Sequence, residues 1–352
     1  MRYLKYYEKR KNKGHLLRTI ILIFAIVIGI EIWLINTNRL ESEDLKISEF
    51  AENNIEFASK FVVGISKENV ILTGNTSSWG SGIIVSKEGY IVTNAHVCGN
   101  KDEVCYVIYD YDEVFSGVVV WSNSEIDLAI VKTNVKYSDC INLGDSNKIN
   151  LSQDIYCIGN PIGPDFSRSV SKGIISGKNR NLEFVENNET YYMTGLIQID
   201  AAINYGNSGG ALVDSLGNLI GINTIKISSS DSMGFAVPIN VIIPIINSYN
   251  EKGDFKEPSL KILGYDKYSI SSYNPQKHIN NGVLIANVES NSNAEKSGLK
   301  SGDIITHIDT DEIKSVMQLR EVLYSKNIGD NIIVKVVRNN SEMLINTKVQ
   351  EH

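Results

Sequence analysis

The chain has 352 residues, of which 42% are hydrophobic and 21% are charged, and its formal net charge is −7. This composition is typical of folded proteins, and the length favours two domains. The sequence holds only 6 Pro and 27 Gly, with no tract of either, which excludes collagen-like and proline-rich disordered proteins. The acidic balance argues against nucleic-acid binding, which needs clustered positive charge facing phosphates.

The first 36 residues differ sharply from this average. Residues 1–18 hold seven Lys and Arg against a single Glu, a local charge of +6, so that −13 belongs to the rest of the chain. Residues 19–35 are apolar apart from Glu31 and would form a helix about 25 Å long, near the short end of what spans a bilayer. A buried core helix would carry a polar face and a cleaved signal peptide a small-residue cleavage site, and neither pattern is found here.

We therefore expect a cytoplasmic basic tail over 1–18, an uncleaved transmembrane signal anchor over 19–36 and a charged stalk over 37–57. The positive flank of such an anchor remains in the cytoplasm. The prediction is a single-pass protein of the cell membrane whose later domains lie outside the cytoplasm.

Residues 58–247 are predicted to form a mainly β domain. Short runs rich in Val, Ile and Tyr alternate with Gly, Asn, Asp and Ser, at 61–65, 82–85, 90–93, 104–109, 117–121 and 128–131. Many short strands at this spacing, without alternating helices, are typical of an antiparallel barrel or sandwich.

A polar, turn-prone linker is predicted at 248–258, followed by a small α+β domain at 259–352. Its expected strands are 282–288, 303–308 and 331–337, and its expected helix is 315–325. The helical spacing would put four side chains on one buried face, namely Val316, Leu319, Val322 and Leu323.

Ser208 is the candidate nucleophile because it stands among glycines in Gly206-Asn-Ser-Gly-Gly210. Glycines allow the tight backbone turn that aims N–H groups at one point, as an oxyanion hole requires. A serine hydroxyl also needs a base and an orienting carboxylate. His96 is the only one of the five His in the β-rich domain, and Asp127 opens an apolar strand. Each residue alone could equally be a turn serine, a strand-end histidine or a solvated acid.

The chain order His, Asp, Ser separates two enzyme folds. Residues 206–210 also fit the G-x-S-x-G elbow of α/β-hydrolases, but there a helix follows the serine, and the acid and histidine come later in the sequence. Here residues 211–222 read as two strands around a turn at Gly217-Asn218. The local pattern therefore argues against the elbow.

Seven motifs together resemble, in order and spacing, the HtrA (Deg) family of trypsin-like serine proteases. They are Thr93-Asn-Ala-His-Val97, Asp127-Leu-Ala-Ile130, Ile158-Gly-Asn-Pro-Ile-Gly163, Ile199-Asp-Ala-Ala-Ile-Asn204, Gly206-Asn-Ser-Gly-Gly-Ala-Leu-Val213, Gly221-Ile-Asn-Thr224 and Gly234-Phe-Ala-Val-Pro-Ile-Asn240. The second domain resembles the PDZ domain of that family, most specifically at 297–305. The resemblance implies a double six-stranded β-barrel protease, unfolded or misfolded proteins as substrates, and a homotrimer.

By the same resemblance, His96, Asp127 and Ser208 are catalytic, and the amides of Gly206 and Ser208 form the oxyanion hole. Ala202, six residues before the nucleophile, and Ile203 would form an uncharged specificity pocket, which predicts cleavage after small or medium aliphatic residues. In the PDZ domain, a C-terminal peptide would bind at Leu263, Gly264, Tyr265 and Leu319, with Met317 and Arg320 nearby on the helix. The alternative is that Leu263 and Leu319 belong to the core.

The four cysteines, Cys98, Cys105, Cys140 and Cys157, all lie in the β-rich domain. Three pairings are possible; Cys98 with Cys105 is the local one, and free buried thiols are an equal alternative. Neither C-x-x-C nor H-E-x-x-H occurs, so no metal or other cofactor is implied. A second functional hypothesis is a stress-sensing regulatory protease, or a PDZ scaffold, acting on one signalling target.

Overall fold

The computed structural model describes residues 52–74, 79–110, 113–186, 189–226 and 232–352. The chain divides into two compact units, Met1–Asn53 and Asn54–His352. The predicted tail and membrane anchor, 1–36, lie outside the described residues. Within the described ranges, no helix is both long and apolar enough to cross a bilayer.

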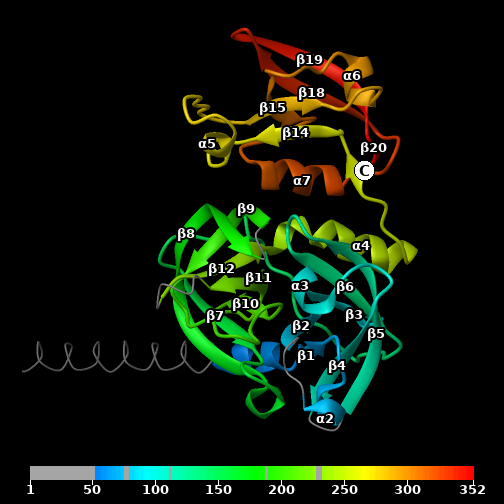
Figure 1. The fold of residues 1–352 in the computed structure, drawn as a ribbon, viewed down its shortest axis with the longest axis vertical. Helices are drawn as coiled ribbons and strands as arrows, with labels where there is room; N and C mark the ends of the chain where they lie inside the picture. Colours follow the sequence, from blue (N-terminus) through cyan, green and yellow to red (C-terminus); the bar gives the residue numbers. More distant parts are fainter. Residues whose placement is uncertain (1–51, 75–78, 111–112, 187–188, 227–231) are drawn as a thin grey trace, which may run out of the picture. The chain divides into compact units, whose positions relative to one another are not determined.

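Six antiparallel strands close the first barrel in the order β1-β2-β3-β6-β5-β4 (Figure 1). Their short apolar runs match those predicted from the sequence, and β1, β2 and β3 are buried along their whole length. A short helix, α3, follows β3 directly, and α2 follows β1. The elements are β1 Val62–Ser66, α2 Val70–Thr73, β2 Gly80–Ile84, β3 Tyr90–Thr93, α3 Ala95–Cys98, β4 Val104–Asp110, β5 Glu113–Asn123 and β6 Leu128–Thr133.

The second barrel repeats this architecture in the order β10-β11-β12-β9-β8-β7. Two strands, β10 and β11, follow the glycine-rich Ser208 segment and meet at the predicted turn, so the argument against the hydrolase elbow is confirmed. The elements are β7 Asp154–Gly159, η1 Pro164–Phe166, β8 Ser169–Glu186, β9 Glu189–Ile199, β10 Ala211–Asp214, β11 Leu219–Lys226, β12 Gly234–Pro238 and η2 Ile239–Val241.

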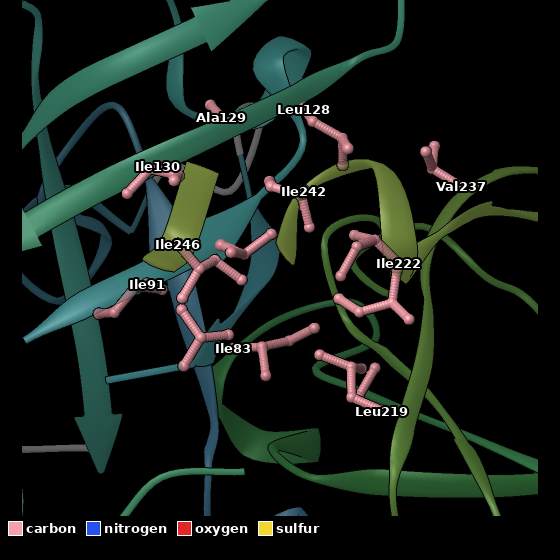
Figure 2. Close-up of a cluster of buried hydrophobic side chains, with 14 of the residues drawn as sticks. Ile83, Ile91, Leu128, Ala129, Ile130, Leu219, Ile222, Val237, Ile242 and Ile246 are labelled. Carbon is pink, nitrogen blue, oxygen red and sulfur yellow. The ribbon is translucent and has the colours of Figure 1, made fainter. Parts of the chain in front are cut away.

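One hydrophobic cluster joins side chains from both barrels. Figure 2 shows Ile242 and Ile246 among Ile83, Ile130 and Ile222. Residues 52–59 are helical and add Ile55 and Ala58 to the same cluster. Burying these apolar side chains from separate segments ties the two barrels into one domain.

Helix α4, Ile243–Lys252, differs from the sequence-based expectation. It continues into residues 248–252, which the polar composition assigned to a linker. The physical reason is a buried stripe on this helix, Ile245, Ile246 and Tyr249, which packs in the barrel cluster, while the polar side chains between them face solvent.

The C-terminal domain is the predicted small α+β module. Its sheet has the order β14-β15-β16-β18-β19, with β17 paired to β16, and encloses a separate hydrophobic cluster. The elements are β13 Pro258–Ser259, β14 Ile262–Tyr265, α5 Ile270–Tyr273, β15 Val283–Val288, α6 Asn293–Ser297, β16 Ile304–Ile308, β17 Asp311–Glu312, α7 Val316–Tyr324, β18 Asn331–Arg338, β19 Ser341–Lys348 and β20 Gln350–Glu351.

Helix α7 lies within the predicted range, and Ser315 caps its N-terminus, because the Ser315 hydroxyl accepts the Gln318 amide at 3.1 Å. Leu319 and Leu323 are buried in the C-terminal core, as expected, and Val316 and Val322 pack against it half-buried. The prediction missed a second buried side of the helix. Met317 and Tyr324 belong to the cluster that holds the barrel side chains.

All four cysteines are free thiols, so none of the three possible pairings is formed. Cys98, Cys105 and Cys157 are buried. Burial disfavours the charged thiolate, and it raises the pKa of Cys105 to about 12 and the pKa of Cys98 and Cys157 further still.

Candidate active site

The first barrel brings His96 and Asp127 together. His96 lies on α3, directly after β3, and Asp127 ends the turn between β5 and β6. The Nδ1 atom of His96 lies 2.9 Å from both carboxylate oxygens of Asp127. Since an ionised carboxylate can only accept, Nδ1 carries the proton. When the ring is neutral, Nε2 is its basic nitrogen, which is the tautomer that a general base requires.

Asp127 is held from several sides. Its side chain is 11% exposed, against 52% for that of His96. Besides the imidazole, its carboxylate accepts the backbone amide of His96 at 3.1 Å and the hydroxyl of Thr224 at 2.7 Å. Its main-chain carbonyl accepts the side-chain amide of Asn94 at 2.7 Å. Asp127 also has a positive φ of 51°, which is uncommon outside glycine.

The Ser208 segment is shaped by its glycines. Gly206 has φ +97° and Gly209 has φ +82°. A Cβ atom on Gly209 would lie 2.0 Å from the carbonyl oxygen of Ser81, so no other residue fits this path. The Ser208 hydroxyl donates to the carbonyl of Thr224 at 2.8 Å. The candidate nucleophile and Asp127 therefore share a partner residue, since Thr224 contacts both.

The backbone amides of Gly206 and Ser208 are available for a ligand. Among the hydrogen bonds of the described residues, neither amide is a donor, although the neighbouring amides of Asn207, Gly209 and Gly210 all donate within the protein. Two closely spaced N–H groups left without an acceptor beside a serine hydroxyl match the donor set of an oxyanion hole.

A hydroxyl from the first barrel fixes the loop that carries these amides. Ser81 of β2 donates through Oγ to the Gly206 carbonyl at 2.7 Å, and its own amide donates to the Ser208 carbonyl at 2.7 Å. The Asn160 amide in turn donates to the Ser81 hydroxyl at 2.9 Å. The bonds of the Ser81 hydroxyl to Gly206 and Asn160 are buried, so both are sheltered from competition by water.

The two residues predicted for the specificity pocket lie in different environments. Ala202 is exposed, and its carbonyl accepts the Ser171 hydroxyl at 2.9 Å. Ile203 is only 3% exposed and packs in the core of the second barrel, against Gly234. The apolar side chain of Ile203 therefore packs in the second barrel, and of the two predicted pocket residues only Ala202 is exposed.

The predicted peptide-binding segment of the PDZ domain forms strand β14. This strand lies at the end of the sheet order, so one of its edges has no partner among the described strands. Leu263 is 52% exposed, whereas Leu319 of α7 is 6% exposed and belongs to the core. Met317 and Arg320 face the protease domain instead: Met317 packs beside Gly195, and Arg320 pairs with Glu125 at 2.6 Å.

Sequence reasoning missed three polar residues of this site: Asn94, Thr224 and Ser81. Asn94 and Thr224 stand inside motifs that carry the family resemblance, which is the only signal that could have singled them out. Ser81 precedes Gly82 in an unremarkable strand. Among the described residues, no group of three or more His, Cys, Asp or Glu is placed to hold a metal ion.

The fold and site define a class, a trypsin-like peptidase joined to a PDZ domain. Family models agree, with a trypsin-like peptidase domain matching residues 80–222 and a PDZ domain matching residues 265–349. A serine protease HtrA-like protein of Staphylococcus epidermidis is 35% identical over 331 residues, covering 89% of this chain and 56% of its own length. A serine protease Do-like HtrA of Lactobacillus helveticus is 35% identical over 290 residues, covering 78% of this chain and 69% of its own.

A solved structure of the HtrA-type protease AlgW with a tripeptide superposes with a TM-score of 0.62 at 31% identity, covering 86% of this chain and 97% of that one. The chain belongs to the HtrA-like family of trypsin-type serine proteases that carry a PDZ domain. It spans only 56% of the length of the Staphylococcus relative.

Proposed function

We propose that the chain is a serine endopeptidase in which His96, Asp127 and Ser208 form the catalytic triad. The observation that carries this proposal is the combination of three features: the Nδ1 atom of His96 bound to Asp127, a serine on a loop shaped by glycines, and two amides without an acceptor beside that serine. A turn serine or a solvated acid would account for one of these features but not all three.

In this mechanism Ser208 attacks the peptide carbonyl, and Nε2 of His96 takes its proton and later delivers it to the leaving amine. Asp127 fixes the imidazole and offsets the charge that forms on it. The amides of Gly206 and Ser208 stabilise the tetrahedral oxyanion, each donor contributing roughly 3–4 kcal/mol in comparable enzymes. Water then releases the acyl group by the same steps.

The substrates we propose are unfolded or misfolded proteins, cut after small or medium aliphatic residues. The support for this specificity is Ala202, an exposed alanine at the position where an acidic residue would select Lys or Arg. The competing proposal, a regulatory protease with one signalling target, predicts cleavage of that target alone.

One experiment tests these claims together. Residues 37–352 and a Ser208→Ala variant are incubated with several unfolded proteins, and the products are mapped by mass spectrometry. We expect the wild type to cut many proteins after aliphatic residues and the variant to lose activity by about 10⁶-fold. Equal proteolysis by both would overturn the mechanism, cuts mainly after Lys or Arg would overturn the pocket assignment, and cleavage of only a native target would favour the regulatory alternative.

The PDZ domain is proposed to bind the C-terminal peptides of its partners. An extended peptide would add to the unpaired edge of β14, with its side chains over α7 and its carboxylate near Leu263 and Gly264. Solved HtrA-type relatives carry a tripeptide or a decapeptide. Titration of the chain with peptides that end in an apolar residue should saturate, and the same peptides with an amidated C-terminus should not.

For localisation we propose a single-pass anchor over 19–36 with both folded domains extracytoplasmic, and a homotrimeric assembly. The support is the charge of +6 ahead of an apolar run in the sequence. Protease added outside intact cells should remove both domains; full protection would contradict the orientation.

Light scattering of residues 37–352 reports the mass of the assembly, and a monomer would contradict the trimer.

A further inference from the structure

We propose that Asn94 is a positioning residue of the active site, which holds Asp127 in its working conformation through the main chain. The proposal rests on the triad proposed above and adds to it a fourth residue that touches neither substrate nor the reacting atoms. Asn94 acts on the carbonyl of Asp127, whereas Thr224 acts on its carboxylate.

The contact is short and fully enclosed. Asn94 is 0% exposed, and its Nδ2 donates to the Asp127 carbonyl at 2.7 Å. The orientation of this amide follows from chemistry, because turning it over would set two acceptor oxygens against each other. Asn94 is therefore a donor to Asp127 and can take no other role in this contact.

A purely structural role explains this asparagine poorly. The other half of its side chain, Oδ1, is buried without a hydrogen-bond partner among the described residues. Asn94 is also the N-cap of α3, yet its side chain makes no capping hydrogen bond. A buried acceptor without a partner opposes folding, so a smaller or apolar residue would suit the fold better unless the donor is needed.

What needs the donor is the backbone of Asp127. With φ at 51°, this residue occupies the left-handed region, which persists in a non-glycine residue only where surrounding contacts hold it. Turning the backbone of Asp127 would swing its carboxylate away from Nδ1 of His96. The Asn94 bond to the carbonyl opposes that rotation.

Asn94 also connects the helix that carries His96 with the turn that carries Asp127. Its own carbonyl accepts the amides of Val97 at 3.2 Å and Cys98 at 3.3 Å, which start the helix that carries His96. Asn94 thus fixes the helix of His96 through its main-chain carbonyl and the turn of Asp127 through its side-chain amide. Asn94 therefore acts on the relative position of His96 and Asp127 from both sides of their contact.

The test compares Asn94→Ala with wild type by the kcat and KM for a peptide substrate, well below the melting temperature of each. We expect kcat to fall by about 10- to 100-fold, as for a displaced catalytic group, with KM changed less than about twofold. The matched control is Val107→Ala in β4, a buried position of the same barrel. It should lower the melting temperature but leave kcat unchanged.

A second measurement separates positioning from general damage. If Asn94 acts through Asp127, adding Asn94→Ala to Asp127→Asn should cost less than about threefold further, because residues that act as a unit are not additive. Equal losses in both backgrounds, or an unchanged kcat, would overturn the proposal. Ser208→Ala is assayed beside them: an active Ser208→Ala variant refutes the triad itself, whereas an inactive one with a fully active Asn94→Ala refutes only this inference.

If Asn94→Ala does not fold, Asn94→Ser provides the second variant, since its hydroxyl is too short to reach the carbonyl but is polar and small. Its readout is the low-field proton resonance of His96 Nδ1, which we expect to move upfield as the bond to Asp127 loosens. A resonance unchanged from wild type would contradict the proposal.

Discussion

The two barrels position their active-site residues by different kinds of contact. The first barrel carries His96 and Asp127, and what fixes them is a set of side-chain hydrogen bonds from Asn94, Thr224 and the imidazole itself. The second barrel carries Ser208, and what fixes it is backbone: the Gly209 amide donates to the Asn223 carbonyl at 2.8 Å, along a path that only glycine can follow.

In each barrel, the active-site segment also receives a hydrogen bond from a hydroxyl of the other barrel. Thr224 of β11 reaches Asp127, and Ser81 of β2 reaches the Gly206 carbonyl. Because each barrel donates a hydroxyl hydrogen bond to the active-site residues of the other, neither barrel positions its own residues alone. It also separates two kinds of damage: substitutions around Asp127 should lower the rate and spare the fold, whereas substitutions around Ser208 should lower both.

The largest effect should come from Asp127→Asn. The amide cannot accept the Nδ1 proton as the carboxylate does, so the imidazole adopts the wrong tautomer and kcat should fall by roughly 10⁴-fold. The side chains have the same shape, so calorimetry should give a melting temperature close to that of wild type. If the Asp127→Asn variant lost kcat because it was largely unfolded, the proposed difference between the two barrels would be wrong.

Gly209→Ala should have the next largest effect, on both rate and stability. A left-handed φ costs a non-glycine residue about 1–2 kcal/mol, and here the new Cβ also meets the Ser81 carbonyl at 2.0 Å. Displacing the oxyanion amides should lower kcat by about 10²- to 10³-fold, and the melting temperature should drop by several degrees.

The matched control for Gly209→Ala is Gly253→Ala. Gly253 also has a positive φ, of 72°, but has no heavy atom within 4 Å of the added Cβ. It should lose stability and retain full activity. If Gly209→Ala behaved in the same way, the backbone account of the Ser208 loop would be wrong.

Thr224→Val should have the smallest effect of the three. The change removes a hydroxyl donated to a carboxylate at 2.7 Å and preserves the shape of the side chain. Hydrogen bonds to charged groups contribute about 1.5–3 kcal/mol, which corresponds to a loss of about 10- to 100-fold in kcat/KM. Thr133→Val in β6, a buried threonine outside the site, should leave kcat/KM unchanged.

Many strands of the first barrel were predictable from short apolar runs between turn residues, and the closed double barrel followed from the family resemblance. Helix α4 was missed because its polar residues dominate the composition of 248–252, while only Ile245, Ile246 and Tyr249 decide its burial. The buried side of α7 at Met317 and Tyr324 was missed because helical periodicity shows which face of a helix is apolar. It does not show whether another part of the protein covers a second face.

Within the site, the sequence singled out His96, Asp127 and Ser208 because a base, a carboxylate and a glycine-flanked hydroxyl in this chain order together indicate one chemistry. It could not assign roles to Thr224, Asn94 and Ser81, whose partners lie 97, 33 and 125 residues away along the chain. Thr, Asn and Ser are common in turns and strands, so only the closed barrels reveal which of them meet a functional group. The burial of Ile203 inside the second barrel could not be inferred from its sequence neighbours.

The four free thiols show what closes the two barrels. No sulfur cross-link closes any loop of the protease domain, so both barrels obtain their closure from strand hydrogen bonds and apolar packing. Three thiols are shielded in the interior, and burial keeps them in their protonated, unreactive form. In this structure no disulfide contributes to holding either barrel together.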